Sequence, residues 1–227
     1  MGETVVRPLI EIITNSTDSY DRMLNKGKEI SGEIIIFNTK KKGYVLDQAE
    51  GMSKEQLWKV TEKIGGKTSG IDEDEPVRGH FGIGLKEAAL ALEKTRILSI
   101  KDGILNEVTI FFNEQGEPFR DETIIDKHVT EEDRIKTGIK ENGTIVRYDI
   151  PKDFNRLGRA NPNWVYDHLL KNVMLRRVLT SDKFNIRFIN GERNLEAKMK
   201  YSLPNGELIL EKKLKLNIMI TIHLKLI

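Results

Sequence analysis

The most informative stretch of the sequence reads Arg78-Gly79-His80-Phe81-Gly82-Ile83-Gly84-Leu85-Lys86-Glu87-Ala88. Its glycines stand at positions i, i+3 and i+5 and lead directly into an apolar-striped segment, which predicts a helix over Leu85–Lys94. Free backbone N–H groups and the positive end of the helix dipole favour a bound anion such as phosphate there. Glycine suits this place because a side chain would keep a phosphate away and would disfavour a positive φ angle. The alternative is an ordinary glycine-rich turn before a helix.

Two other phosphate-binding motifs are excluded by their spacing. Gly65-Gly66-Lys67-Thr68 ends like a Walker loop, but Thr61 occupies the place of the earlier glycine and no apolar strand precedes it. The order of the glycines in 79–84 is the reverse of the Gly-x-Gly-x-x-Gly fingerprint of dinucleotide-binding folds. A phosphate site here must therefore be of another type.

A helix expected over residues 8–26 carries polar side chains on one face. Glu11, Asn15 and Asp18 lie at i, i+4 and i+7, and Glu11 and Asn15 are about 6 Å apart along the helix axis. This arrangement suits a carboxylate that polarises a water beside an amide oxygen that holds a hydrated magnesium ion, which takes few protein ligands. The alternative is the solvated side of an amphipathic helix.

Two short polar segments mark the ends of strands. In Asp47-Gln48-Ala49-Glu50-Gly51-Met52 a strand ends at an acid that can accept a hydrogen bond from an exocyclic amine such as that of adenine. The glycine four residues later lets the backbone approach a ring. Downstream, Asn142-Gly143-Thr144 opens a strand with a hydroxyl that can share a water with an acid and a base edge. An Asx turn and a simple turn into a strand are the respective alternatives.

The order of the elements favours an α/β fold. Strands that mostly follow one another without helical crossovers indicate an antiparallel or mixed sheet with helices on one face. We expect one domain over residues 1–205 and a strand-like tail over 206–227, with the start of a further region as the alternative for the tail. Helices are expected from Ser53, which forms a capping-box pattern with Gln56, and from Asn161 and Pro162 to about Leu175. Strands are expected near 30–38, 43–46, 96–101, 105–113, 144–150, 185–189, 195–203 and 208–216.

Composition excludes several classes of function. The 227 residues hold 37 Lys+Arg against 35 Asp+Glu, a formal net charge of +2, which gives no reason to expect nucleic acid or an anionic membrane as a partner. The chain has no cysteine, so disulfides, thiolate metal sites and cysteine nucleophiles are excluded. The first residues lack a signal-peptide pattern, and the most apolar stretch, Leu214–Ile227, is too short to span a bilayer. We expect a soluble, cytoplasmic protein without a membrane partner.

Taken together and in this order, the motifs resemble those of the GHKL ATPase superfamily, which includes gyrase B, mismatch-repair MutL, MORC proteins, the large heat-shock chaperones and histidine kinases. The resemblance covers residues 7–150. It rests on Glu11-x-x-x-Asn15-x-x-Asp18, Asp47…Gly51-Met52, Gly79-x-x-Gly82-x-Gly84 and Gly143-Thr144. It implies the Bergerat fold, an α/β two-layer sandwich that binds Mg-ATP in a pocket covered by a mobile lid.

The resemblance also implies roles for particular residues. Glu11 would be the general base for the attacking water and Asn15 the magnesium ligand. Asp47 would accept a hydrogen bond from the adenine amine, Thr144 would share its water, and residues 65–80 would form the lid. The implied ATP-binding set is Asn15, Asp18, Asp47, Gly51, Met52, Gly79, Phe81, Gly82, Ile83, Gly84, Leu85, Lys86 and Thr144. The implied partners are ATP, a second copy of the chain in an ATP-dependent homodimer and, by family analogy alone, DNA or a client protein.

One departure from the family pattern concerns Ala49, which stands where the family's Asp-x-Gly-x-Gly motif has its middle glycine. Because alanine tolerates positive φ poorly, we expect a reshaped loop or a weakened nucleotide affinity. Glu11 favours ATP hydrolysis that drives lid closure and dimerisation, since histidine kinases of the family commonly have Asn at that position. A protein kinase of the same fold and a non-hydrolysing, ATP-gated interaction module are the alternatives.

Overall fold

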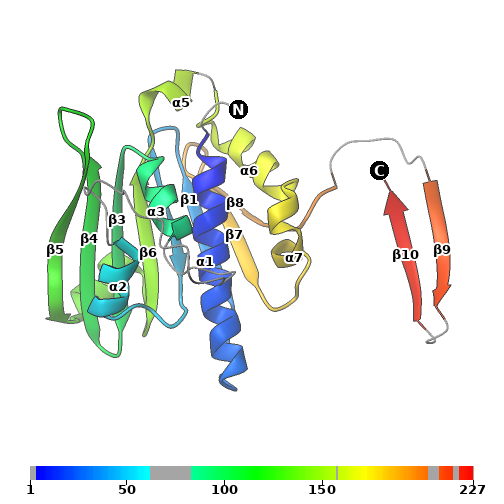
Figure 1. Cartoon of the computed structure of the whole chain (residues 1–227), viewed down its shortest axis with the longest axis horizontal. Coiled ribbons are helices and arrows are strands. Elements are labelled where there is room, and N and C mark those ends of the chain that lie inside the picture. Colours follow the sequence, from blue (N-terminus) through cyan, green and yellow to red (C-terminus); the bar gives the residue numbers. More distant parts are fainter. Residues whose placement is uncertain (1–3, 62–82, 157, 204–209, 217–219, 227) are drawn as a thin grey trace, which may run out of the picture.

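The main element of the computed structural model, which describes residues 4–61, 83–156, 158–203, 210–216 and 220–226, is an eight-stranded sheet (Figure 1). Its strands lie in the order β5-β4-β3-β6-β2-β1-β7-β8. Neighbouring strands pair antiparallel except β1 and β7, which pair parallel. The predicted mixed, mostly antiparallel sheet is therefore confirmed. The strands are β1 Glu33–Asn38, β2 Lys42–Asp47, β3 Lys94–Lys101, β4 Ile104–Phe112, β5 Pro118–His128, β6 Gly143–Asp149, β7 Asn185–Asn190 and β8 Leu195–Lys198.

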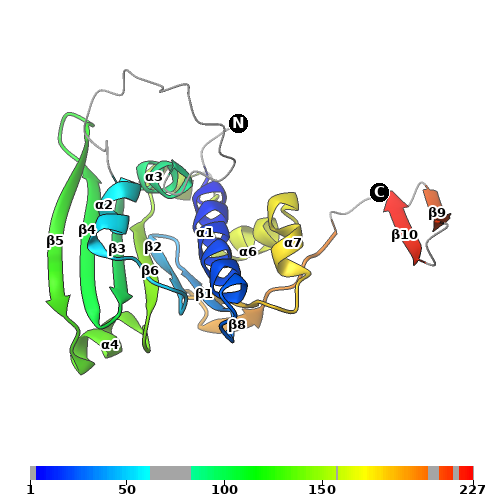
Figure 2. The same ribbon diagram turned by 60° about the horizontal axis from the view of Figure 1, so that its bottom comes forward.

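Helices form a second layer over one face of this sheet (Figure 2). The longest of them, α1, packs on the sheet through a stripe of buried side chains that includes Leu9, Ile13 and Tyr20. Each buried aliphatic side chain contributes about 1.5–3 kcal/mol, so packing of this stripe holds the helix in place. The helices are α1 Val6–Asn25, α2 Lys54–Thr61, α3 Ile83–Leu90, α5 Lys152–Arg156, α6 Pro162–Leu170, the 3-10 turn η1 Val173–Leu175 and α7 Arg176–Leu179.

Side chains alternate between the two faces of the sheet, as the pleat requires. In β1, Ile34 and Ile36 face the helices and are fully buried, whereas Phe37 points to the opposite side and is half-buried. We call that opposite side, which carries Phe37, Leu98 and Ile145, the open face. A short helix, α4 Glu131–Thr137, covers part of it, and the residues that follow α4 pack in a second apolar cluster with Leu98 and Ile145.

Two helices, α2 and α6, begin at the capping residues predicted from the sequence. The N–H of Gln56 donates to the Ser53 hydroxyl at 3.3 Å, and the N–H of Ser53 donates to the Gln56 side chain at 3.0 Å. This is the reciprocal capping box at the start of α2. The side chain of Asn161 accepts from the N–H of Asn163 at 3.0 Å, with Pro162 as the first helical residue of α6.

Two predicted helix ends were wrong. The helix expected over Leu85–Lys94 ends at Leu90, because the residues from Lys94 onward form β3. Thr95 in this strand is fully buried between β4 and β6, and such pairing outweighs local helix propensity. The helix expected to reach Leu175 ends at Leu170, and the next turn begins at Asn172, whose side chain accepts from the N–H of Met174 at 3.0 Å.

Two elements between β4 and β6 were not predicted. The strand β5 lies at the edge of the sheet and mixes charged with apolar residues, so it lacks the apolar run of a central strand. The signals for α4 are present in the sequence, however. Thr130 and Asp133 form a capping box, and Gly138 ends the helix with a φ angle of 75°.

The C-terminal strands form a separate hairpin. β9 Leu210–Leu216 and β10 Ile220–Leu226 pair antiparallel in a two-stranded sheet, apart from the main sheet in Figure 1. The boundary at residue 205 stays a prediction, and the lid predicted over 65–80 lies outside the described residues. Within the described ranges, every helix is too short or too polar to cross a membrane.

Candidate functional site

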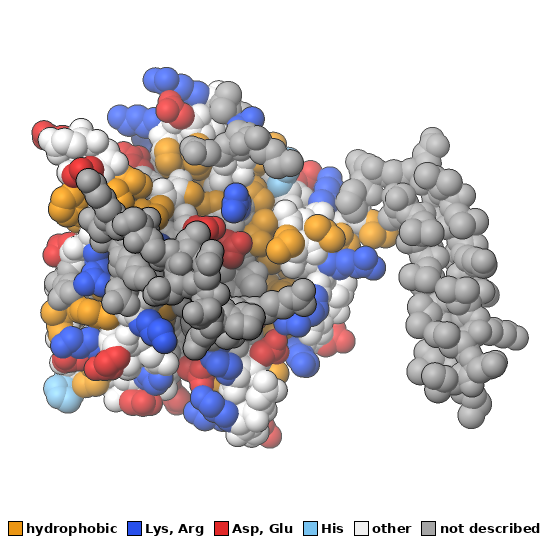
Figure 3. Space-filling view, viewed as in Figure 1, with side chains coloured by type: hydrophobic (Ala, Val, Ile, Leu, Met, Phe, Trp, Pro, Cys, Tyr) orange, Lys and Arg blue, Asp and Glu red, His pale blue; other side chains and the backbone are white. Residues whose placement is uncertain are grey.

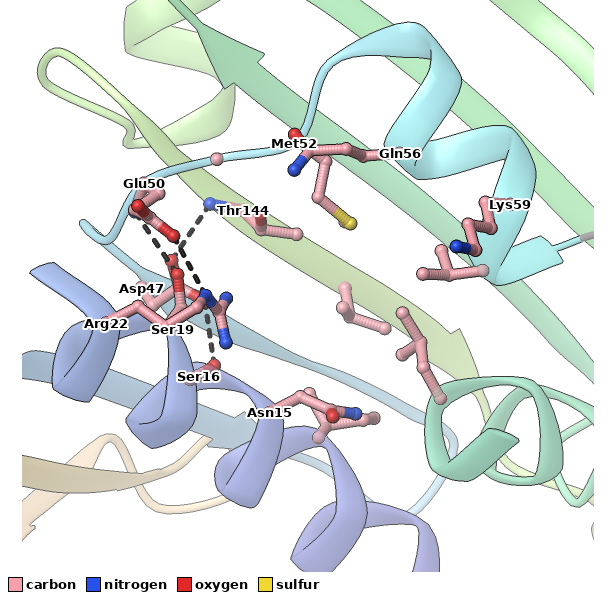
Figure 4. A pocket seen from close by; sticks show the side chains of 15 residues that line it. Asn15, Ser16, Ser19, Arg22, Asp47, Glu50, Met52, Gln56, Lys59 and Thr144 are labelled. Carbon is pink, nitrogen blue, oxygen red and sulfur yellow. Dashed lines mark hydrogen bonds and ion pairs between the residues drawn. The ribbon is translucent and has the colours of Figure 1, made fainter. Parts of the chain in front are cut away.

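A cavity of about 370 Å³ lies between α1, α2 and α3 above the strands β2 and β6 (Figure 4). It has an apolar wall and a polar floor and rim. It brings together several residues predicted from the sequence, namely Asn15, Asp47, Gly51, Met52, Leu85 and Thr144. The other lining residues are Ile12, Ser16, Ser19, Arg22, Glu50, Gln56, Lys59, Val60 and Val146.

Asp47 forms part of the floor at the end of β2. Its Oδ2 accepts a hydrogen bond from the Ser16 hydroxyl at 2.7 Å, and its Oδ1 accepts from the N–H groups of Ala49 at 3.0 Å and Thr144 at 3.1 Å. Burial raises the pKa of the Asp47 carboxyl above its ordinary value, and these hydrogen bonds oppose that rise. A carboxylate has about four acceptor positions, so one position is left for a ligand.

The polar floor continues across neighbouring strands. Asp47 of β2, Thr144 of β6 and Ser99 of β3 are cross-strand partners. The Ser99 hydroxyl lies 2.9 Å from that of Thr144 and accepts the N–H of Met52 at 2.7 Å. Ser99 therefore positions both Thr144 and the loop that enters α2. No sequence motif marks Ser99, since its place depends on the pairing of three distant strands.

The loop after Asp47 accommodates Ala49 without the strain expected from the sequence. The described non-glycine residues with positive φ are elsewhere, at Asp102, Asp126 and Asn194. The tight position is instead Gly51, with a φ of 66° and with the Ile100 carbonyl oxygen too close to leave room for a Cβ. Gly51 therefore requires glycine, whereas Ala49 does not.

A polar stripe on α1 was not predicted. Ser19 and Arg22 follow Asn15 at i+4 and i+7 and line the cavity with it. Arg22 Nε lies 3.0 Å from one carboxylate oxygen of Glu50, and Lys26 Nζ lies 2.6 Å from the other. Partial burial opposes ionisation of Glu50, but the hydrogen bonds from Lys26 and Arg22 hold its pKa below the ordinary value. The helical spacing from Asn15 was the signal that could have identified this stripe.

Asn15 projects from α1 toward the cavity (Figure 4). Its side-chain Nδ2 is buried and has no hydrogen-bond partner among the described residues. Buried polar groups are normally hydrogen-bonded, and the two ends of an amide are assigned rather than observed. The amide can therefore turn its oxygen to a magnesium ion that keeps most of its waters. The described residues contain no group of three or more His, Asp or Glu that could hold a metal.

Glu11 lies at the junction of α1 and α3, outside the set that lines the cavity. A Cβ built on Gly84 would stand 2.5 Å from Glu11 Oε2, so the carboxylate is in contact with the first turn of α3. Glycine at this position leaves room for the carboxylate beside the helix start. Glu11 thus lies one helical turn from Asn15 and beside Gly84, the last glycine of the predicted phosphate motif.

Two described residues of the predicted set do not line the cavity: Asp18, which is exposed, and Lys86, which is half-buried. Gly79, Phe81 and Gly82 lie outside the described residues, as does the side chain of Ile83, whose backbone begins α3.

The fold and the cavity together define a nucleotide-binding α/β domain of the Bergerat type. A family model described as "Histidine kinase-, DNA gyrase B-, and HSP90-like ATPase" matches residues 4–137. The chain therefore belongs to this family, and ATP binding is its function at that level.

A solved structure supports the fold. The chain resembles the 43K ATPase domain of Thermus thermophilus gyrase B, solved in complex with an aminocoumarin, with a TM-score of 0.52 and 14% sequence identity. The likeness covers 86% of this chain and 45% of that one, so the chain spans less than half of the gyrase B structure. At this identity the likeness shows the fold alone. No curated protein matches the chain.

Proposed function

We propose that the chain hydrolyses ATP in the cavity between α1, α2 and α3, with magnesium as cofactor. The observation that carries this proposal is the convergence on one cavity of Asp47, Thr144 and Asn15, whose Nδ2 has no hydrogen-bond partner among the described residues. The three side chains come from separate elements, and each has a chemistry that the reaction needs.

The adenine end of the site would lie at the polar floor. Asp47 has one acceptor position left after its three hydrogen bonds, and an exocyclic amine can donate to it. Thr144 would share a water between this carboxylate and the base. Gly51 and Met52 would line the ring, because the absence of a side chain at Gly51 lets the loop lie close to the strands.

The phosphate end would lie between Asn15 and the start of α3. Asn15 would hold the magnesium ion, which when bound would neutralise phosphate charge. Glu11 would orient and deprotonate the attacking water, a role in which a positioned carboxylate typically contributes 10²–10⁴-fold to the rate. Its contact with the first turn of α3 puts it near the helix end that favours an anion.

Nucleotide binding would also control assembly. Residues 65–80 would close over the ATP as a lid, and closure would promote a homodimer or the engagement of a client protein or DNA. The match to the gyrase B ATPase domain supports this only through the shared fold.

Phosphate release and ligand binding, measured on the same samples, test the proposal. Wild type should bind a non-hydrolysable ATP analogue more tightly with magnesium than without it by calorimetry, and should release phosphate from ATP. Glu11→Gln should retain analogue affinity within about threefold while turnover falls by about 10² or more. Equal turnover in both proteins would rule out Glu11 as the base.

Two other outcomes identify the alternatives. Label from the γ-phosphate that appears on protein instead of in solution would indicate a kinase. Tight Mg-ATP binding without phosphate release, under conditions that promote dimers, would indicate an ATP-gated interaction module.

A further inference from the structure

The open face of the sheet carries a second cavity, of about 410 Å³, on the side away from the nucleotide cavity. Four basic side chains from three adjacent strands line it: Lys42 of β2, Lys94 and Arg96 of β3, and Arg147 of β6. Asp149 adds one acid. The near-zero net charge of the chain therefore hides a local excess of positive charge.

Strand register arranges these side chains in two rows. One row runs Lys42, Asp149, Lys94, and the next runs Tyr44, Arg147, Arg96. Cross-strand partners point to the same face with Cβ atoms about 4.5–5.5 Å apart. The two arginines therefore lie directly opposite each other, an arrangement that destabilises a sheet unless an anion compensates for it.

Among the described residues, three of the four cations have no intramolecular partner. Within the described part of the chain, the side chains of Lys42, Lys94 and Arg96 form neither an ion pair nor a hydrogen bond. Arg147 donates to the backbone carbonyl of Lys136, so it keeps its charge. Burial, followed by the charge of Arg96, lowers the pKa of Arg147, whereas Glu107 opposes this effect.

A neighbouring arginine on the same face, Arg187, is neutralised by two acidic side chains. Arg187 of β7 lies 2.7 Å from Glu33 and 2.5 Å from Glu196. Strands of this sheet thus supply acidic partners to Arg187, whereas no described acid forms an ion pair with Arg96.

Aromatic pairs flank the cations on both sides. Phe37 and Tyr44 stack with ring centroids 5.1 Å apart, and Phe111 and Phe119 stack at 6.2 Å. These rings extend the two rows of cross-strand partners, since Phe37 pairs with Tyr44 and Phe111 pairs with Lys94. Phe119 is 44% exposed. From β1 to β5 the face crosses five strand spacings, about 24 Å.

We propose that this open face binds single-stranded nucleic acid, with phosphates over Lys42, Lys94, Arg96 and Arg147 and with bases against the two aromatic pairs. Basic grooves combined with exposed rings bind single strands because the cations follow the backbone and every base can stack. An acidic polypeptide would use the cations but gain nothing from the rings. The inference goes beyond the proposed ATPase activity, since it concerns the opposite face of the sheet.

Fluorescence anisotropy with a labelled oligothymidylate of about 15 nucleotides, titrated at several salt concentrations, tests the proposal. Wild type should bind with a log–log salt slope of about −2 to −3, as expected for three or four neutralised phosphates on a single strand. Lys94→Ala/Arg96→Ala should weaken binding about tenfold or more and reduce the slope by about 1.4. Phe119→Ala should weaken it about fivefold or more through lost stacking.

Lys183→Ala is the matched control, an exposed lysine outside the cavity, and it should change affinity less than about twofold. Thermal melts should show that all variants remain folded. Absence of binding at low salt, or equal affinity in wild type and the double variant, would overturn the proposal. Displacement of the oligonucleotide by polyglutamate together with no effect of Phe119→Ala would also overturn it, in favour of an acidic polypeptide.

Discussion

The two faces of the sheet use polar residues in opposite ways. On the helix-covered face, Asp47 accepts three internal hydrogen bonds, and Thr144 and Ser99 are hydrogen-bonded to each other. On the open face, Arg96 lies opposite Arg147, and in the described residues it has no acidic partner. The polar residues of the helix-covered face are therefore held in place by internal hydrogen bonds. The two arginines of the open face instead carry positive charge that no described ion pair compensates.

The strands β2 and β6 each contribute to both faces, through residues three positions apart. In β6, Thr144 faces the nucleotide cavity and Arg147 faces the open side. In β2, Asp47 and Tyr44 divide in the same way. The space-filling view of the helix side shows acidic and basic side chains interspersed (Figure 3), unlike the cationic rows of the open face. Variants can therefore perturb one face and leave the other as an internal control.

The largest expected effect concerns Gly51, which fixes the loop at the edge of the nucleotide cavity. Gly51→Ala should lower the free energy of unfolding by about 3–5 kcal/mol, because a Cβ would clash with the Ile100 carbonyl and φ is positive. Gly27→Ala is the control, with a φ of 73° but no atom within 4 Å of the new Cβ; it should cost about 1–2 kcal/mol. Urea unfolding measures both. Equal losses of unfolding free energy in the two variants would mean that the loop at Gly51 relaxes around the new Cβ and that the floor of the cavity is not rigid.

The next largest effect tests whether the nucleotide cavity and the open face bind their ligands independently. Asp47→Asn should weaken binding of a non-hydrolysable ATP analogue about 100-fold, because it replaces a buried acceptor with a group that can donate toward the ligand amine. Oligonucleotide binding should stay within about twofold, since Asp47 lies on the other face. Calorimetry and anisotropy on one preparation test this. Parallel losses in both assays would show that the faces are coupled or that the variant is misfolded.

The residues that sequence reasoning found are those whose chemistry is fixed by local spacing. Asp47, Gly51 and Asn15 each belong to a short motif, and the strands and helices around them follow from apolar periodicity and capping residues. The end of α3 was predicted wrongly because strand pairing fixes the conformation of the residues from Lys94 onward, in β3. No local sequence signal indicates that pairing.

The residues that were missed depend on strand order. Ser99 joins the floor only because β3 and β2 both pair with β6, and the cationic rows require the same order. The net charge of +2 gave no reason to expect a nucleic acid partner, and DNA was implied by family analogy alone. Three strands far apart in the chain bring Lys42, Arg96 and Arg147 together, which composition cannot reveal.

A smaller effect is expected from the hydroxyl that supports the floor. Ser99→Ala removes the contact with Thr144 and the acceptor for the N–H of Met52, so ATP-analogue affinity should fall about fivefold to tenfold. Thr109→Val is the matched control, because it breaks a comparable hydroxyl contact with Thr123, 3.0 Å long, away from the cavity. It should leave analogue affinity unchanged. A similar loss in both variants would indicate general destabilisation.

The smallest effect compares two carboxylates that each accept three hydrogen bonds. Burial raises the pKa of Asp47, whereas hydrogen bonds from Lys127 and Thr130 lower the pKa of Asp133 in α4 to about 2. Because the pKa of Asp133 is lowered on folding, its stabilisation is complete above the ordinary value of 3.8 and is lost as pH falls toward about 2. Asp133→Asn should therefore be less stable than wild type at pH 6, with a difference that shrinks between pH 4 and 2, as measured by urea unfolding. A difference that does not change with pH would show that Asp133 acts through the capping geometry and not through its charge.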